Sequence, residues 1–185
     1  MLFHTQVSEV EDIIAGVDAK LRQLHPGAGY IIRDLLPKDL GLTNEQWTLV
    51  LASITADQYN DYISKALDDE IAVGIVGVLF NETAANTATT QIKISRGKTD
   101  IALIPVEDAV DFADQGHAWF DQAYVIPGDV TVDIQLWCDN GAADESVGFL
   151  GRIIEKRDKN INPSKDIPTF RGAAPVPEAA TAGGA

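Results

Sequence analysis

The chain has too little cysteine and too short an apolar run for two common ways of building a protein. Its 185 residues include one cysteine, Cys138, which has no partner for an internal disulfide, so a disulfide-rich secreted scaffold is excluded. The longest nearly unbroken apolar run, residues 71–80, is about half the length that a membrane-spanning helix needs. The hydrophobic fraction of 45% is typical of a globular protein, and the length suits one domain with a proper core.

Basic residues are scarce, and one long segment has none. The chain has 28 acidic and 14 basic residues, which gives a formal net charge of −14. Residues 99–151 contain eleven carboxylates and no lysine or arginine, whereas residues 152–171 are rich in lysine and arginine. Phosphate contacts require a basic surface, so we expect no nucleic-acid binding by the body of the protein. The acidity suits a halophilic protein, because self-repulsion is screened in high salt; an acidic protein from ordinary salinity is the alternative.

The sequence also lacks the motifs of metal, nucleotide and nucleophile chemistry. The three histidines are His4, His25 and His117. They are far apart and have no carboxylates at ligand spacing, so no metal site is predicted. There is no dinucleotide-binding glycine loop and no G-x-S-x-G elbow. Asp139, Asp144 and Glu145 crowd one loop, but their spacing does not match an EF-hand, so we interpret them as a solvated acidic surface. We predict no catalytic residue and no cofactor, which favours a structural or binding role.

What the chain does have is strand patterning, most clearly in residues 130–138. Apolar Val130, Val132, Ile134, Leu136 and Cys138 alternate there with Thr131, Asp133, Gln135 and Trp137. A period of two residues predicts a strand with one buried face. Residues 127–129 have turn chemistry and open this strand, and residues 118–126 and 147–154 are predicted as further strands.

Other segments extend the same pattern. Residues 71–80 are apolar at odd and even positions, which predicts a central strand covered on both faces, and Gly74 and Gly77 permit a packed layer to approach closely. Residues 91–106 read as a hairpin. With the weaker candidates there are about eight strands. We therefore predict a mainly β fold, a single jelly-roll β-sandwich over residues 28–159 with one or two short peripheral helices.

An amphipathic helical segment is predicted over residues 1–27. Residues 8–11 form a capping box, an apolar stripe of helical period follows, and His25 and Pro26 end it. The polar face carries more acid than base, and anionic lipid would repel it. We therefore expect the helix to pack on the domain; docking on a partner chain or a membrane is the alternative.

Three further segments are less clear in the sequence. We predict a strand over residues 47–54 followed by a helix over 56–67, whose apolar residues fall at helical spacing; one long helix over 44–67 is the competing interpretation. Residues 107–114 suit a short helix. Residues 160–185 are rich in alanine, proline and glycine and are predicted to be an extended tail.

The order of these segments resembles a family of viral capsid proteins. The resemblance lies in residues 71–80, the hairpin 90–106, residues 119–128 (Trp-Phe-Asp to Ile-Pro-Gly) and residues 150–157 (Leu-Gly-Arg-Ile-Ile-Glu-Lys-Arg). Together these resemble the single vertical jelly-roll major capsid proteins of icosahedral viruses with an internal membrane, which infect haloarchaea and Thermus-type bacteria. The acidity and length are most similar to the smaller of the two haloarchaeal capsid proteins. The N-terminal helix has no counterpart in that pattern.

The resemblance implies a structural protein of the virion capsid and not an enzyme. Its implied partners are copies of itself and a second, larger capsid protein, with the internal membrane or minor capsid proteins as further neighbours; no specific nucleic acid and no small-molecule substrate is implied. Cationic residues near the end of the chain would then contact acidic neighbouring subunits: Arg152, Lys156, Arg157, Lys159, Lys165 and Arg171. Carboxylates would form an acidic exterior: Asp108, Asp111, Asp114, Asp133, Asp139, Asp144 and Glu145.

A binding module of another class is the alternative. An extracellular β-sandwich that binds carbohydrate or another ligand would use outward-facing aromatic rings as stacking platforms, and Trp119 and Trp137 are the candidates. A metal-dependent cupin-type enzyme is a third alternative, for which the histidine spacing gives no support.

Overall fold

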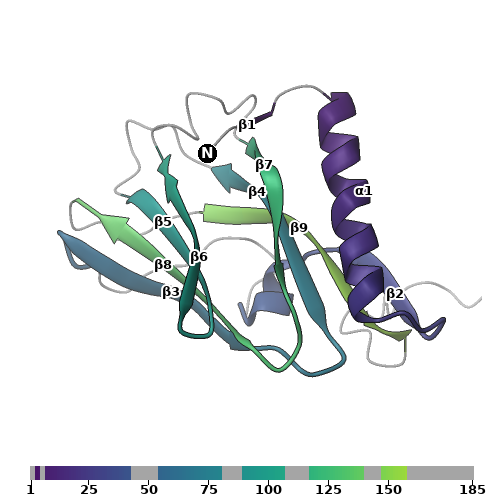
Figure 1. The fold of residues 1–185 in the computed structure, drawn as a ribbon. Helices are drawn as coiled ribbons and strands as arrows, with labels where there is room; N and C mark the ends of the chain where they lie inside the picture. Colours follow the sequence, from purple (N-terminus) through teal and green to yellow (C-terminus); the bar gives the residue numbers. More distant parts are fainter. Residues whose placement is uncertain are drawn as a thin grey trace, which may run out of the picture.

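The protein is a two-sheet β-sandwich with one long helix on its outside (Figure 1). The computed structural model describes residues 3–4, 7–42, 54–80, 89–106, 117–139 and 147–157. In chain order the elements are β1 (Phe3–His4), α1 (Val7–Leu24), β2 (Tyr30–Asp34), the 3₁₀ helix η1 (Pro37–Leu40), β3 (Gln58–Ala66), β4 (Ala72–Phe80), β5 (Thr89–Arg96), β6 (Thr99–Pro105), β7 (His117–Ile126), β8 (Thr131–Cys138) and β9 (Val147–Lys156).

The strand order is that of a jelly roll. One sheet has the order β1-β7-β4-β9-β2 and the other β3-β8-β5-β6, and neighbouring strands are antiparallel. The long strands are β2 to β9, and we count them from one to eight in chain order. The first sheet then has the order 1-8-3-6, from β2 to β7, and the second has the order 2-7-4-5, from β3 to β6. This order results when two Greek keys fold over each other. The predicted mainly β jelly-roll sandwich is confirmed.

The predicted alternation in β8 is confirmed residue by residue. Val132, Ile134, Leu136 and Cys138 are fully buried between the sheets, and the residues between them are partly exposed on the outer surface. Cys138 is therefore a small apolar residue of the core. Because the neighbours β3 and β5 align with β8, its outward side chains lie at the middle of a three-strand surface.

Strand β4 is buried on both faces, as its apolar sequence predicts. Val73 and Ile75 belong to the core between the sheets, whereas Ala72 and Val76 lie under α1. Gly74 allows the helix to approach, because a Cβ atom built there would lie 2.2 Å from Cγ2 of Val17. The predicted close approach of a packed layer at this glycine is confirmed.

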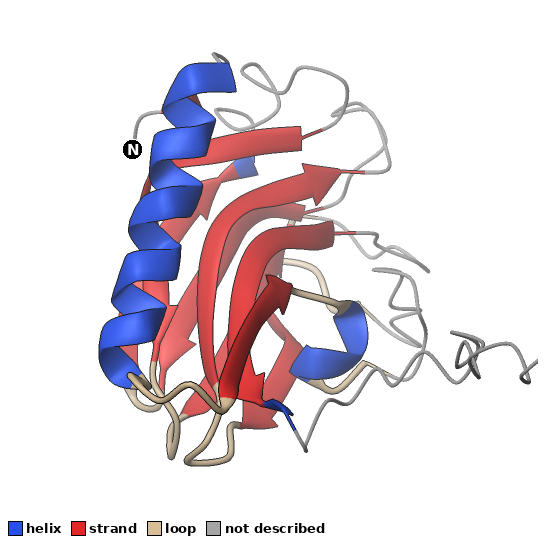
Figure 2. Cartoon of the chain, turned by 90° about the vertical axis from the view of Figure 1, so that its right-hand side faces the viewer, coloured by secondary structure: helices blue, strands red, loops and turns tan. Residues whose placement is uncertain are grey.

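Helix α1 covers the outer face of the five-stranded sheet (Figure 2). Val17 and Leu21 are its most buried side chains and pack against β4 and β9, while the opposite side of the helix is exposed. The expectation that the helix packs on its own domain is confirmed. Among the described residues, no helix is both long enough and apolar enough to cross a membrane.

The predicted helix over residues 56–67 is wrong, and so is the competing helix 44–67, because residues 58–66 form strand β3. The helix prediction failed because the pairing of β3 with β8 has a register shift between Asp61 and Ile63. The shift lets adjacent residues Tyr62 and Ile63 both be buried, so the apolar spacing resembles that of a helix. Most of the predicted strand 47–54, the predicted helix 107–114 and the predicted tail 160–185 lie outside the described residues.

Candidate functional site

The predicted subunit-contact residues that the structure describes begin in strand β9. Arg152 donates from Nε to Oδ1 of Asp18 in α1 (3.0 Å) and also pairs with Asp34 of β2. Burial alone would lower the pKa of Arg152, but the hydrogen bonds to Asp18 and Asp34 and their negative charges outweigh it, so the pKa is raised. Arg152 therefore ties the helix to the edge of the sheet within one chain.

The next basic residues are nearer the surface. Lys156 Nζ lies 2.6 Å from Oε1 of Glu70. Arg157 is exposed, and its backbone N–H donates to the carbonyl of Gly29 (2.9 Å). The remaining predicted contact residues, Lys159, Lys165 and Arg171, lie outside the described residues. Contact with neighbouring subunits stays a prediction for all six.

Two of the predicted acidic exterior residues are described, one in strand β8 of the four-stranded sheet and one directly after it. Asp133 is partly exposed on the outer side of β8 and accepts a hydrogen bond from Oγ of Ser64 (2.6 Å). Asp139 is exposed immediately after β8. Five lie outside the described residues: Asp108, Asp111, Asp114, Asp144 and Glu145. No cluster of three or more His, Cys, Asp or Glu suited to a metal ion occurs in the described part of the chain.

The structure contains a buried ion-pair cluster that sequence reasoning missed. Arg33 of β2 donates from Nε to Oε1 of Glu155 (2.7 Å) and from its two terminal nitrogens to Asp39 (2.6 and 2.8 Å). Both carboxylates have fully buried side chains. Burial would lower the pKa of Arg33, but the bonds and charges of Asp39 and Glu155 raise it above its ordinary value.

Strand alternation gives the inward positions of two of these charges, but not their pairing with each other or with Asp39. Alternate residues of a strand point to the same face of the sheet. Arg33 is two residues from Ile31, and Glu155 is two residues from the buried Ile153, so both charges lie at inward positions of paired strands. Asp39 reaches them from η1 and also accepts the backbone N–H of Leu36 (2.8 Å). The cluster therefore links β2, β9 and η1.

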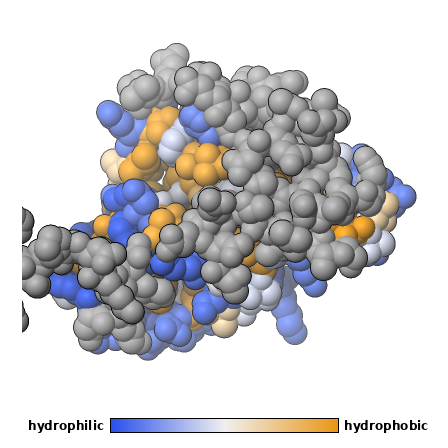
Figure 3. Space-filling view, turned by 180° about the vertical axis from the view of Figure 1, so that it is seen from behind, coloured by the Kyte–Doolittle hydropathy of each residue, from blue (hydrophilic) through white to orange (hydrophobic). Residues whose placement is uncertain are grey.

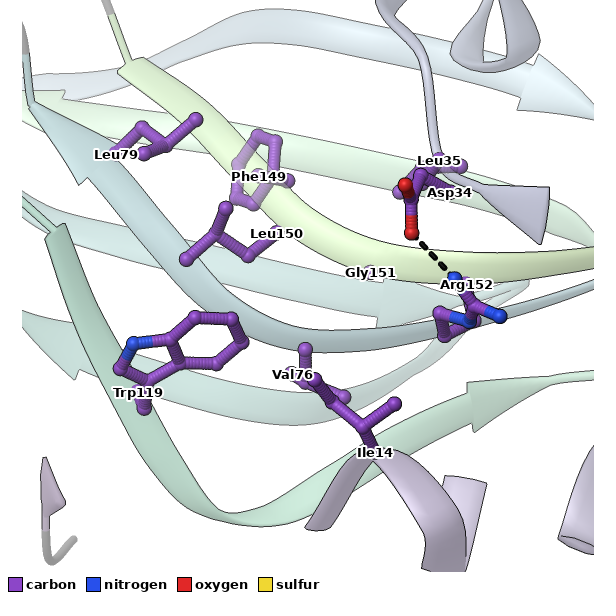
Figure 4. Close-up of a pocket in the computed structure, with 10 residues that line it drawn as sticks. All are labelled: Ile14, Asp34, Leu35, Val76, Leu79, Trp119, Phe149, Leu150, Gly151 and Arg152. Atoms are coloured by element: carbon purple, nitrogen blue, oxygen red, sulfur yellow. Dashed lines mark hydrogen bonds and ion pairs between the residues drawn. The ribbon is translucent and has the colours of Figure 1, made fainter. Parts of the chain in front are cut away.

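An apolar pocket of about 150 Å³ lies between α1 and the five-stranded sheet (Figure 4). Ile14, Val76, Trp119 and Leu150 contribute hydrophobic side chains to it, and the pair of Arg152 with Asp34 lies at one end. Seen from behind, hydrophobic residues gather in a patch at the upper left, on the side of the molecule that carries α1 (Figure 3). The pocket between α1 and the five-stranded sheet is suited to an apolar side chain from another protein.

The two tryptophans predicted as stacking platforms lie on different sheets. Trp119 of β7 packs with the cluster under α1 and is partly buried, with its ring centroid 6.0 Å from that of His117. Trp137 points outward from β8, on the sheet that α1 does not cover. The sandwich therefore separates the two rings, so one binding surface can use only one of them, and ligand stacking on either ring stays a prediction.

The outward side chains of β3, β8 and β5 form three rows across the four-stranded sheet, here called the open face. The strand register aligns Tyr59 with Trp137 and Gln91 in the first row, Asp61 with Gln135 and Lys93 in the second, and Ser64 with Asp133 and Ser95 in the third. Two hollows lie on this surface, of about 300 Å³ beside the first row and about 260 Å³ over the other two.

Hydrogen bonds within the open face fix the orientation of its side chains. The Tyr59 hydroxyl donates to Oε1 of Gln91, and Nε2 of Gln135 donates to Oδ1 of Asp61 (2.7 Å). Lys93 Nζ lies 4.1 Å from the centroid of the Tyr59 ring, a cation–π contact. Burial, with the nearby charge of Asp100, raises the pKa of Tyr59.

No family model matches the chain, and no curated protein matches it. We therefore infer the function from the fold, the charge distribution and these surfaces.

Proposed function

We propose that the protein is a viral structural protein, a major capsid protein whose copies form capsomers of an icosahedral shell around an internal membrane. The observation that carries the proposal is the jelly-roll strand order, reached by a sequence whose strand and turn pattern resembles that capsid family. Jelly rolls also occur in lectins and cupins, so the fold alone does not decide the function. The described residues supply no cluster of metal-ligating type that would support a cupin.

Three further features support an assembling protein. The charge of −14 keeps single copies apart at low salt, whereas molar salt screens that repulsion and strengthens apolar contacts. The pocket between α1 and the sheet offers a place for an apolar side chain of a neighbouring subunit. Arg157 is exposed, and it and the cations that follow it in the sequence, Lys159, Lys165 and Arg171, oppose acidic neighbours, although each exposed pair contributes only about 0–1 kcal/mol.

The experiment is to express tagged full-length and truncated chains in the cells that make the native assembly. The truncated chain ends at Asp158 and keeps every described strand. We expect the full-length chain in the large, fast-sedimenting fraction and the truncated chain only among small species, still folded by circular dichroism. Recovery of the full-length chain only as small species would contradict the capsid function. Equal incorporation of both chains would contradict only the role of the tail.

A further inference from the structure

We propose that the open face binds a neutral oligosaccharide, with Trp137 and Tyr59 as its stacking residues. The proposal is independent of assembly, because it concerns the outward side chains of β3, β8 and β5 within one chain. On a capsid, such a site would attach the particle to a glycosylated surface; on an isolated module, it would be the ligand site itself.

The aromatic rings of Tyr59 and Trp137 meet at a steep angle and form a corner beside a hollow. The centroids of Tyr59 and Trp137 are 5.1 Å apart, and their planes meet at 78°. The hollow that they line with Thr90 and Gln91 has a volume of about 300 Å³, the size at which small-molecule pockets begin. The face of an aromatic ring is negative, so it attracts the weakly positive C–H groups on one face of a sugar.

Polar groups suited to hydroxyls surround this corner. Asp139 Oδ1 accepts the indole N–H of Trp137 (3.2 Å) and the hydroxyl of Thr90 (3.2 Å), which leaves its second carboxylate oxygen to accept from a ligand. Gln91 accepts the Tyr59 hydroxyl through Oε1, so its amide N–H groups can donate. The rings and their partners are held in place before a ligand arrives, which reduces the entropy lost on binding.

The length of the open face indicates an oligosaccharide and not a single sugar. Trp137 and Asp133 are four residues apart on β8, or about 14 Å at a rise of about 3.4 Å per residue. The second hollow continues in that direction, over residues that already pair, including Ser64 with Asp133 (2.6 Å) and Ser95 with Asp100 (2.7 Å). Such groups exchange hydrogen bonds with hydroxyls along a chain of sugars.

The charge of the open face indicates that the ligand is neutral. Four carboxylates lie on or beside it: Asp61, Asp100, Asp133 and Asp139. Two lysines, Lys93 and Lys98, oppose them, so the net charge is −4 + 2 = −2. A sulfated or uronic-acid sugar would be repelled, whereas a neutral sugar loses nothing to this field.

The test is titration of the full-length protein with trisaccharides of glucose, galactose, mannose and N-acetylglucosamine, and with the matching monosaccharides, by isothermal calorimetry. We expect saturable binding of at least one trisaccharide, about tenfold or more tighter than its monosaccharide. Trp137→Ala should weaken binding by about tenfold or more, and Gln91→Ala should weaken it as well. Trp119→Phe, on the other sheet, is the matched control and should bind as the unmodified protein does.

Circular dichroism of each variant separates lost binding from lost folding, and Gln91→Ala serves if Trp137→Ala does not fold. No saturable binding across the panel would overturn the proposal. So would tighter binding of a sulfated analogue, or a loss of binding in Trp119→Phe but not in Trp137→Ala. None of these results bears on assembly into particles, so failure here leaves the capsid proposal standing.

Discussion

At the scale of single residues, the Arg33 cluster and the Arg152 cluster use the same chemistry in different surroundings. Arg33 lies between two carboxylates with fully buried side chains, whereas Arg152 pairs with Asp18 and Asp34, whose side chains are 32% and 83% exposed. A buried charge that loses its partner has no water to replace it, but an exposed one does. The two arginines should therefore differ greatly in their effect on stability.

We predict that Arg33→Met lowers the free energy of unfolding by about 3–5 kcal/mol, because Asp39 and Glu155 remain buried and uncompensated. Arg152→Met is the matched control and should cost about 1 kcal/mol or less. Urea unfolding followed by circular dichroism measures both. Equal losses for the two variants would show that the Arg33 cluster is not shielded from solvent as described.

At the scale of elements, the contact of α1 with β4 depends on one missing side chain. Gly74 leaves room for Val17, and an added Cβ would lie 2.2 Å from its Cγ2. Gly16 belongs to the same helix, but a Cβ there would meet nothing within 4 Å. Two glycine-to-alanine changes, one beneath the helix and one on it, should therefore have opposite signs.

We predict that Gly74→Ala destabilises the protein by about 1–3 kcal/mol through overpacking, while Gly16→Ala stabilises it by about 0.5–1 kcal/mol through helix propensity. In the double variant Gly74→Ala/Val17→Ala the clash disappears, since the nearest remaining Val17 atom, Cβ, lies 3.6 Å away. Its loss should be smaller than the sum of the single losses. Urea unfolding gives the free energies of unfolding of Gly74→Ala, Gly16→Ala, Val17→Ala and the double variant. A loss in the double variant equal to the sum of the losses in Gly74→Ala and Val17→Ala would contradict the described contact.

Strand β3 shows why part of the open face could not be predicted from the sequence. Regular alternation identified β8 and placed Trp137 on an outer surface, and the structure agrees. The register shift at Asp61 gives β3 an apolar spacing like that of a helix. The sequence pattern therefore did not indicate that Tyr59 lies beside Trp137. Pairing across a sheet joins residues far apart in sequence, and a local pattern does not encode which strands become neighbours.

At the scale of the whole molecule, period-two patterning was enough to predict the jelly roll although β3 was predicted as a helix, because each strand must bury one face. The position of α1 was also predictable from its acidic outer side and apolar stripe. The Arg33 cluster was not, since Glu155, Arg33 and Asp39 belong to three separate elements. Among the described basic residues, Arg33, Arg152 and Lys156 pair with carboxylates of their own chain. The remaining acidity must be accommodated by salt or by neighbouring molecules.

The most direct measurement is the size of the native material that contains this chain, by sedimentation and electron microscopy in molar salt. The capsid proposal predicts uniform, regular shells in which this chain is a major component, released together with lipid when the particles are broken. Recovery of the chain as a monomer of 19.9 kDa, or in small complexes without shells, would contradict it.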